Sequence, residues 1–244
     1  MSLAYAHEPE TEPRRAHVIV VGNQKGGAGK STAAVLLGTE LAAKGAGVTI
    51  IDADPNRPVS RWAKRPNKPE TLDVVADVTE ETIIPQIEEA ASRSAFVIVD
   101  LEGTASMTVG FALSRADLVI IPTKGSMLDA AEAVKAIKLL RAQEQAFRRK
   151  IPAAILFTQT NPAVRPRTLR HIEAQFAQSD VPVMKTHLFE RDAYRALFMF
   201  GGGVSTLDPA EVSNIKTARA NAESFMREVV ARLRAQTARL EEVA

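Results

Sequence analysis

The segment that follows the first apolar run of the chain has the residue types and spacing of a phosphate-binding loop. It reads Gly22-Asn-Gln-Lys-Gly-Gly-Ala-Gly-Lys-Ser-Thr32 and opens a helical pattern. A glycine-rich turn between a strand and a helix directs backbone N–H groups and the positive end of the helix dipole at an anion. Lys30 can reach the β- and γ-phosphates of a nucleotide, and the Ser31 hydroxyl can ligate Mg²⁺. The segment therefore predicts nucleotide binding.

Carboxylates follow two further apolar runs at the point where each run ends. The run ending at Ile51 leads into Asp52 and Asp54, and the run Phe96–Val99 leads into Asp100. In open α/β sheets the carboxyl ends of the strands border the ligand crevice. Phosphoryl transfer requires positioning and charge neutralisation, with one polar group orienting the attacking water. We therefore expect these three carboxylates to lie beside the bound phosphates.

Short runs rich in Val, Ile and Leu alternate with helical patterns along most of the chain. We expect strands over His17–Val21, Val48–Ile51, Leu72–Ala76, Phe96–Val99, Leu118–Ile121 and Ala153–Phe157. We expect helices over Lys30–Lys44, Thr82–Ser94, Leu128–Phe147, Pro166–Gln178 and the stretch from Pro209 to about Glu242. Uninterrupted apolar strands alternating with helices are typical of α/β proteins with one doubly wound, mostly parallel sheet and helices on both faces. The pattern predicts one such domain over residues 17–244, preceded by a disordered tail over residues 1–16.

The composition disfavours several classes of function. The chain contains no Cys, which excludes a Cys-ligated metal or iron–sulfur cluster and a cysteine nucleophile. No apolar run approaches the roughly 20 residues of a membrane span, and the first residues lack the features of a signal peptide, so we expect a cytoplasmic protein. Residues 148–244 carry 15 Lys and Arg against 10 Asp and Glu, which suggests a polyanionic partner.

The phosphate loop departs from the ordinary pattern G-x-x-x-x-G-K-[ST], because Gln24 occupies the first glycine position and Lys25 precedes Gly26. In this it resembles the deviant Walker-A ATPases of the ParA/MinD family, whose Lys-Gly-Gly-x-Gly-Lys-[Ser/Thr] loop is diagnostic. The full string is especially like the ParA branch. The resemblance implies ATP and Mg²⁺ as ligands, slow and partner-stimulated hydrolysis, and a homodimer formed around two ATP molecules. In that dimer Lys25, which has no clear task within one subunit, would contact the nucleotide of the other protomer.

The resemblance also implies roles for individual residues. Lys25, Lys30 and Asp54 would be catalytic, with Asp54 positioning the attacking water. The magnesium shell would be formed by Ser31, Asp52 and Asp100. The residues expected to contact the nucleotide are Gly26, Gly27, Ala28, Gly29, Lys30, Ser31, Thr32, Gly103 and, for adenine, Gln159 or Asn161. Glu102 departs from the family pattern, because it adds a negative charge near the phosphates where members more often have Pro.

Two further strings resemble particular branches of this family. The string from Asp52 to Trp62 looks like that of VirC ATPases, which act at the border of transferred DNA. The string Glu190-Arg-Asp-Ala-Tyr-Arg195 is similar to those proteins and to MipZ-like positioning ATPases. Within the first string, Arg57, Arg61 and Trp62 have two open interpretations, a solvated turn with one packed aromatic or a loop that contacts a second protein.

The family resemblance leaves several functions open. The first is a nucleoid-associated ATPase whose dimer binds DNA without sequence preference and segregates or positions DNA or a protein cargo, stimulated by a ParB-like adaptor. The candidate DNA-binding residues are Arg165, Arg167, Arg170, Lys185, Arg195, Lys216 and Arg219. A MinD-like membrane-cycling ATPase and a VirC-like DNA-transfer ATPase are the alternatives. The C-terminal residues lack the bulky apolar face of a membrane-targeting helix, and we expect no stable membrane anchor.

Overall fold

The computed structural model describes residues 16–103, 106–178 and 180–241. Its centre is a seven-stranded sheet of order β3-β2-β4-β1-β5-β6-β7, in which every neighbouring pair is parallel. The strands are β1 (His17–Val21), β2 (Val48–Ala53), β3 (Leu72–Val75), β4 (Phe96–Leu101), β5 (Leu118–Thr123), β6 (Ala153–Thr160) and β7 (Leu188–Phe189). The predicted doubly wound sheet is confirmed. The predicted disordered tail lies outside the described residues, apart from Ala16, which is buried.

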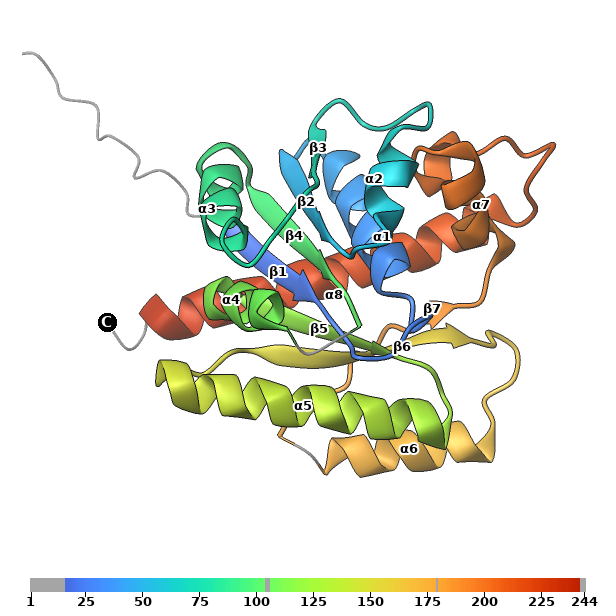
Figure 1. The fold of residues 1–244 in the computed structure, drawn as a ribbon. Coiled ribbons are helices and arrows are strands. Elements are labelled where there is room, and N and C mark those ends of the chain that lie inside the picture. The colour runs from blue at the N-terminus through green and yellow to red at the C-terminus, as the bar shows by residue number, and fades with distance from the viewer. Residues whose placement is uncertain (1–15, 104–105, 179, 242–244) are drawn as a thin grey trace, which may run out of the picture.

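Helices cover both faces of the sheet (Figure 1). One face carries α1 (Lys30–Ala42), α2 (Pro58–Ala63), α7 (Asp192–Phe200) and α8 (Ile215–Glu241), with a short 3₁₀ helix at Val204–Thr206. The other face carries α3 (Ile83–Arg93), α4 (Met107–Arg115), α5 (Met127–Phe147) and α6 (Arg167–Ala177). Alternate residues of β1 enter the two cores, Ile19 on one side and Val20 on the other. Because both faces of the strands are buried, the strands read as uninterrupted apolar runs in the sequence.

The chain order reverses at β1, which lies between β4 and β5. A crevice forms at the carboxyl ends of the strands where the order reverses, and ligands of open α/β sheets bind there. The loop after β1 opens into this crevice. The ends of β2 and β4 lie beside it, with Asp52 and Asp100 opposite each other in register.

Several short elements have no counterpart in the sequence periodicity. These are α2, α4, α7 and β7, which are too short for an apolar period to stand out. The closing helix begins at Ile215 rather than at Pro209, so the predicted start is wrong. The backbone of Asn214 has a positive φ of 56°, and residues before it form turns around Asp208.

The edge strand β7 is held in place by side chains of α8. The Asn221 Oδ1 accepts a hydrogen bond from Phe189 N at 3.1 Å, and its Nδ2 donates to His187 O at 2.8 Å. The Glu228 carboxylate accepts from the backbone N–H groups of Lys185 and Thr186. These bonds satisfy the backbone of a two-residue strand and fix the start of α7. Within the part of the chain that the structure describes, no helix has the length and apolar character needed to cross a bilayer.

Candidate active site

The loop after β1 is folded as an anion cradle. It ends at Gly29, whose φ of 91° only glycine adopts readily, and Gly29 is the N-cap of α1. Lys30 is the first residue of that helix and is 6% exposed, with its Nζ donating to Lys25 O at 3.2 Å. The loop borders a cavity of about 440 Å³ whose lining includes Gly26, Gly27, Gly29 and Lys30. A buried ammonium, a helix N-terminus and loop N–H groups together can bind a polyphosphate.

Residues at the ends of β6 and β4 contact this loop. The Thr158 hydroxyl at the end of β6 donates to Ala28 O at 2.7 Å. Gly103, after β4, approaches the loop so closely that a Cβ there would lie 2.8 Å from Gln24 O. Ser31, Thr32 and Gly103, which the sequence predicts to contact nucleotide, line the phosphate cavity, whereas Ala28 is fully buried and does not line it.

Asp52 and Asp100 form a pair of buried carboxyl groups at the ends of β2 and β4, behind the cavity-lining residues Lys30 and Ser31 that act on Asp100. They are 2% and 0% exposed, and one oxygen of Asp52 and both oxygens of Asp100 have no hydrogen bond of good geometry among the described residues, although the Ser31 hydroxyl lies close enough to act on Asp100. Burial, together with the neighbouring Asp52 carboxylate, raises the pKa of Asp100 to about 8. Unpartnered buried carboxyl oxygens beside a phosphate cavity fit a divalent cation, whose charge would favour the ionised form of both groups. With the Ser31 hydroxyl they supply the oxygen ligands or water contacts that Mg²⁺ prefers.

Asp52 is oriented by a residue that the sequence patterns do not reveal. Ser60 of α2 donates two hydrogen bonds to Asp52 Oδ2, from its backbone N at 2.6 Å and from its hydroxyl at 2.7 Å. These bonds fix one oxygen and leave Oδ1 without a partner among the described residues. No pattern in the sequence marks Ser60, because α2 itself is too short to be recognised from the sequence.

Asp54 lies at the mouth of the phosphate cavity rather than beneath it. It lines the cavity together with Glu102, and its Oδ1 accepts from Asn56 N at 2.8 Å. Asp54 is only half-buried, so a water molecule can reach it. A half-buried carboxylate at this place can accept a hydrogen bond from a water that faces the phosphates. Glu102 has no ion pair within the described residues, and so its charge also faces the cavity.

Lys25 is engaged within its own subunit. Its Nζ lies 2.7 Å from Asp129 Oδ1 in the first turn of α5. The idea that Lys25 has no task within one subunit is therefore wrong, because the ion pair gives it one. The ion pair connects the phosphate loop to the loop between β5 and α5.

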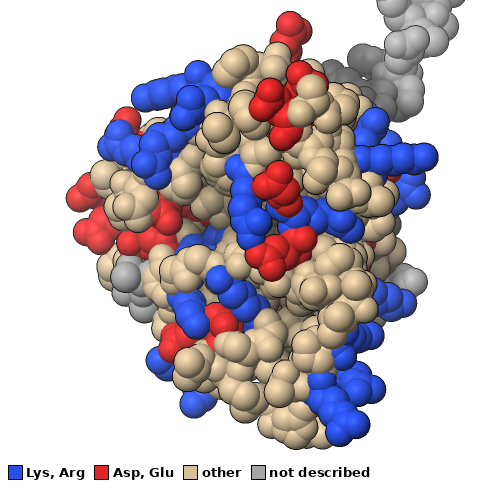
Figure 2. Space-filling model, turned by 90° about the vertical axis from the view of Figure 1, so that its right-hand side faces the viewer, with Lys and Arg blue, Asp and Glu red and all other residues tan. Residues whose placement is uncertain are grey.

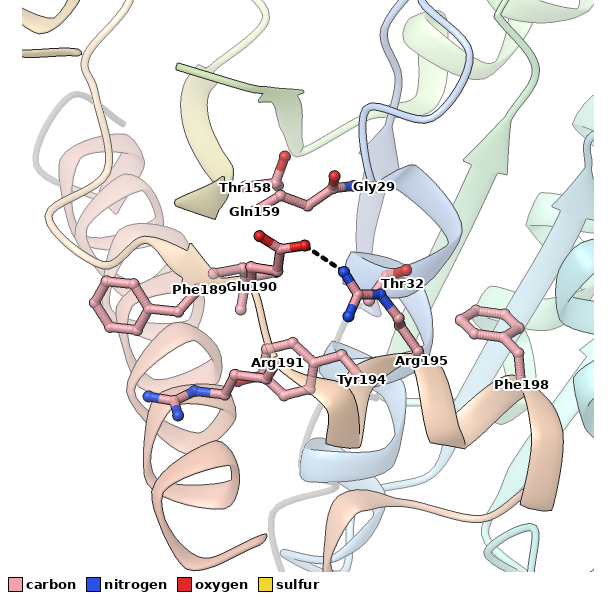
Figure 3. Close-up of a pocket in the computed structure, with 11 residues that line it drawn as sticks. Gly29, Thr32, Thr158, Gln159, Phe189, Glu190, Arg191, Tyr194, Arg195 and Phe198 are labelled. Atoms are coloured by element: carbon pink, nitrogen blue, oxygen red, sulfur yellow. Dashed lines mark hydrogen bonds and ion pairs between the residues drawn. The ribbon is translucent and has the colours of Figure 1, made fainter. Parts of the chain in front are cut away.

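A second cavity, of about 190 Å³, continues from the phosphate cavity and shares Gly29, Thr32 and Gln159 with it. Its far wall comes from β7 and α7. Figure 3 shows Glu190 and Arg195 pointing toward each other across this wall, where they form an ion pair. The size and position of this cavity suit the nucleoside part of a nucleotide.

The two candidate adenine contacts have different surroundings. Gln159 has a positive φ of 53° at an irregularity of the β6–β7 pairing, and its Nε2 donates to Gly27 O at 3.1 Å. A strand irregularity of this kind redirects a side chain, and here it places Gln159 between the two cavities. Asn161 lines neither cavity, because its Oδ1 accepts from the backbone N–H groups of Ala163 and Val164.

The candidate DNA-binding residues do not form one cluster. Arg165 is paired with Glu173, and Arg195 lines the nucleoside cavity. The remaining candidates are exposed, with Arg167 and Arg170 on α6, Lys185 before β7, and Lys216 and Arg219 on α8. Since α6 and α8 cover opposite faces of the sheet, the arginines of α6 lie on the other side of the sheet from Lys216 and Arg219. Figure 2 shows separate groups of basic side chains with acidic ones between them.

The residues of the string from Asp52 to Trp62 lie in different environments in the structure. Trp62 is 1% exposed, and its Nε1 donates to Gly202 O at 3.0 Å, so it is a core residue that joins α2 to the loop after α7. Arg57 forms an ion pair with Asp77, and Arg61 is exposed.

Comparisons with known proteins agree with this geometry. A profile of the VirC1 protein family matches residues 16–242. The protein ParA of Rhizobium radiobacter is 44% identical over 208 residues, which cover 85% of this chain and 93% of that protein. The virC1 protein of the same organism is 31% identical over 182 residues, covering 71% and 76%.

Solved structures share the fold at low sequence identity. The structure of a Cyanothece McdA variant in complex with ATP superposes with a TM-score of 0.70 at 14% identity, covering 89% of this chain and 97% of that one. The family match, the fold and the Lys-Gly-Gly-x-Gly-Lys-Ser pattern of the phosphate loop all indicate the same protein family. The chain belongs to the VirC1 family of ParA/MinD-type P-loop ATPases.

Proposed function

We propose that the chain binds Mg·ATP and hydrolyses it slowly as a ParA-type partition ATPase. The observation that carries this proposal is the phosphate cavity lined by Lys30 and Ser31 of the loop. Both of these residues act on the buried carboxyl of Asp100 at the end of β4, and Asp52 of β2 lies opposite Asp100 in register. Relatives of this sequence include a protein named ParA and a chromosome partitioning protein. We infer that the activity of this chain is of the same kind.

Each side chain has a task in this proposal. Lys30 and the loop N–H groups hold the β- and γ-phosphates and stabilise the charge that moves onto the leaving oxygen. Ser31, Asp52 and Asp100 hold Mg²⁺, which when bound neutralises phosphate charge. Asp54 accepts a hydrogen bond from the attacking water and aligns it with the γ-phosphate. The ribose and base occupy the second cavity, where Gln159 marks the boundary between the phosphates and the nucleoside.

Replacing Ser60 tests the magnesium assignment without removing a ligand. Ser60→Ala keeps the backbone bond to Asp52 but loses the hydroxyl bond, so Asp52 is less firmly oriented. We expect the affinity for Mn²⁺ in the presence of ADP, measured by electron paramagnetic resonance, to fall about tenfold. Ser94→Ala is the matched control, because it removes a hydroxyl bonded to Thr49 away from the cavity. Equal Mn²⁺ affinity in Ser60→Ala and in the unmodified protein would contradict the role of Asp52 at the metal.

We further propose that ATP brings two protomers together and that the dimer binds DNA without sequence preference. An adaptor protein would then stimulate hydrolysis and link the cycle to a DNA or protein cargo. Lys25 supports the first part, because it lies on the phosphate loop with about a third of its side chain exposed. The exposed arginines of α6 support the second part. Dimerisation doubles the number of phosphate contacts and makes DNA affinity depend on nucleotide.

Removing the charges of α6 tests the DNA proposal. Arg167→Ala/Arg170→Ala is expected to weaken ATP-dependent DNA binding and to flatten its salt dependence, by about 0.9 in log–log slope per lost phosphate contact. Fluorescence anisotropy with duplex DNA at several salt concentrations measures both quantities. Arg93→Ala/Arg115→Ala is the matched control, since it removes two exposed arginines from α3 and α4 on the same face. Unchanged affinity and slope would place the DNA surface elsewhere. An ATP dimer that ignored DNA but bound anionic liposomes would favour a MinD-like membrane cycle.

A further inference from the structure

Asp129 is a buried carboxylate held by two different groups. It is 5% exposed in the first turn of α5, where it forms the ion pair with Lys25. The hydroxyl of Ser126, the N-cap of α5, donates to its other oxygen. Burial by itself would raise the pKa of Asp129, but the hydrogen bonds from Lys25 and Ser126 and the charges of Lys25 and Lys124 lower it below its ordinary value. Asp129 is therefore an anion that depends on nearby cations.

The proposed dimer takes one of those cations away. If Lys25 reaches the nucleotide of the other protomer, its ammonium must leave Asp129. A buried carboxylate that loses its cation is strongly disfavoured. The departure of Lys25 therefore has to be compensated at the same place, or it will oppose dimerisation.

Lys124 is the cation placed to compensate it. It lies in the loop between β5 and α5, and its Nζ is 3.9 Å from the position of a Cβ on Gly27. Its side chain has no ion pair or hydrogen bond within the part of the chain that the structure describes. The Lys124 ammonium thus lies beside the phosphate loop that carries Lys25, and its charge lowers the pKa of Asp129, though less than Lys25 and Ser126 do.

We propose that Asp129 exchanges cations during dimerisation, with Lys124 replacing Lys25 as the latter moves to the nucleotide of the other protomer. The proposal rests on the ATP-dependent dimer proposed above. It makes Lys124 a positioning residue that acts through Asp129 and not through the phosphates. It also explains why Lys124 lies next to a phosphate loop that already carries Lys25 and Lys30.

A double-mutant cycle tests the exchange. The parent protein carries Asp54→Ala so that ATP persists, and sedimentation equilibrium in Mg·ATP measures the dimer dissociation constant. Lys124→Gln is expected to weaken the dimer about tenfold, because Asp129 then loses its replacement cation. Asp129→Asn removes the charge that needs compensation, so Lys124→Gln should have no further effect in that background. Lys135→Gln, an exposed lysine of α5 paired with Glu132, is the matched control.

The possible results distinguish a failure of the cation-exchange proposal from a failure of the dimer proposal. A parent protein that dimerises with ATP but is unaffected by Lys124→Gln contradicts the exchange alone. A loss that persists in the Asp129→Asn background shows that Lys124 contacts phosphate or the other protomer directly, and this also overturns the exchange. A parent protein that stays monomeric in Mg·ATP contradicts the proposed dimer, and the exchange with it. Thermal unfolding of each variant with ADP shows whether it is folded.

Discussion

Lys30→Ala is expected to lose ATP affinity by about 100-fold or more. The ammonium of Lys30 is buried beneath the phosphate cavity, and a hydrogen bond to a charged group contributes roughly 1.5–3 kcal/mol, where 1.4 kcal/mol is tenfold in affinity. Its loss also removes the buried positive charge of the loop that offsets the charge of the phosphates. Equilibrium binding of a fluorescent ATP analogue measures the change.

Two further variants make this result specific to the charge. Lys30→Met keeps the packed stem without the ammonium and should bind as weakly as the alanine variant. Lys44→Ala removes a lysine just after the opposite end of α1, where it pairs with Glu223, and should bind ATP normally. Tight binding by Lys30→Met would mean that the stem, and not the charge, supports the nucleotide.

Asp54→Ala is expected to bind ATP normally and to hydrolyse it about 100-fold more slowly. The carboxylate lines the mouth of the phosphate cavity without being part of the buried cradle, so its loss removes water alignment and leaves the phosphate contacts intact. Phosphate release under single-turnover conditions measures the rate, and the same fluorescent analogue measures binding.

The control for Asp54→Ala is an acid of the same strand region outside the cavity. Asp73→Ala removes an exposed carboxylate of β3 that pairs with Arg93, and it should leave the rate unchanged. A wild-type rate in Asp54→Ala would instead assign the water to Glu102, the other carboxylate at the cavity mouth. Glu102→Gln would then show the loss.

The sequence predicts the strands and the phosphate loop well because their signals are local. The central strands β1, β2, β4 and β5 are largely apolar runs buried on both faces, and Gly29, Lys30 and Ser31 are adjacent in the chain. The strand ends that carry Asp52 and Asp100 are likewise readable, since parallel strands bring their carboxyl ends to one edge.

The remaining features depend on contacts between distant segments. Ser60 is recognisable as a partner of Asp52 only when α2 is folded back over the end of β2. Asp129 meets Lys25 because β1 and β5 are neighbours in the sheet, although they are far apart in the chain. Asn161 has the residue type expected for base recognition, but its side-chain oxygen accepts hydrogen bonds from backbone N–H groups of the turn that follows it.

If the chain binds DNA as proposed above, the placement of the basic residues on both faces of the sheet has a consequence for residence time on DNA. A straight duplex that lies along α6 cannot also lie along α8, because the sheet separates the two helices. Each protomer therefore offers few phosphate contacts to any one duplex, and the affinity that depends on counterion release stays small per protomer. Under the proposed cycle, the separated protomers would leave DNA quickly, and hydrolysis would set the rate at which they redistribute.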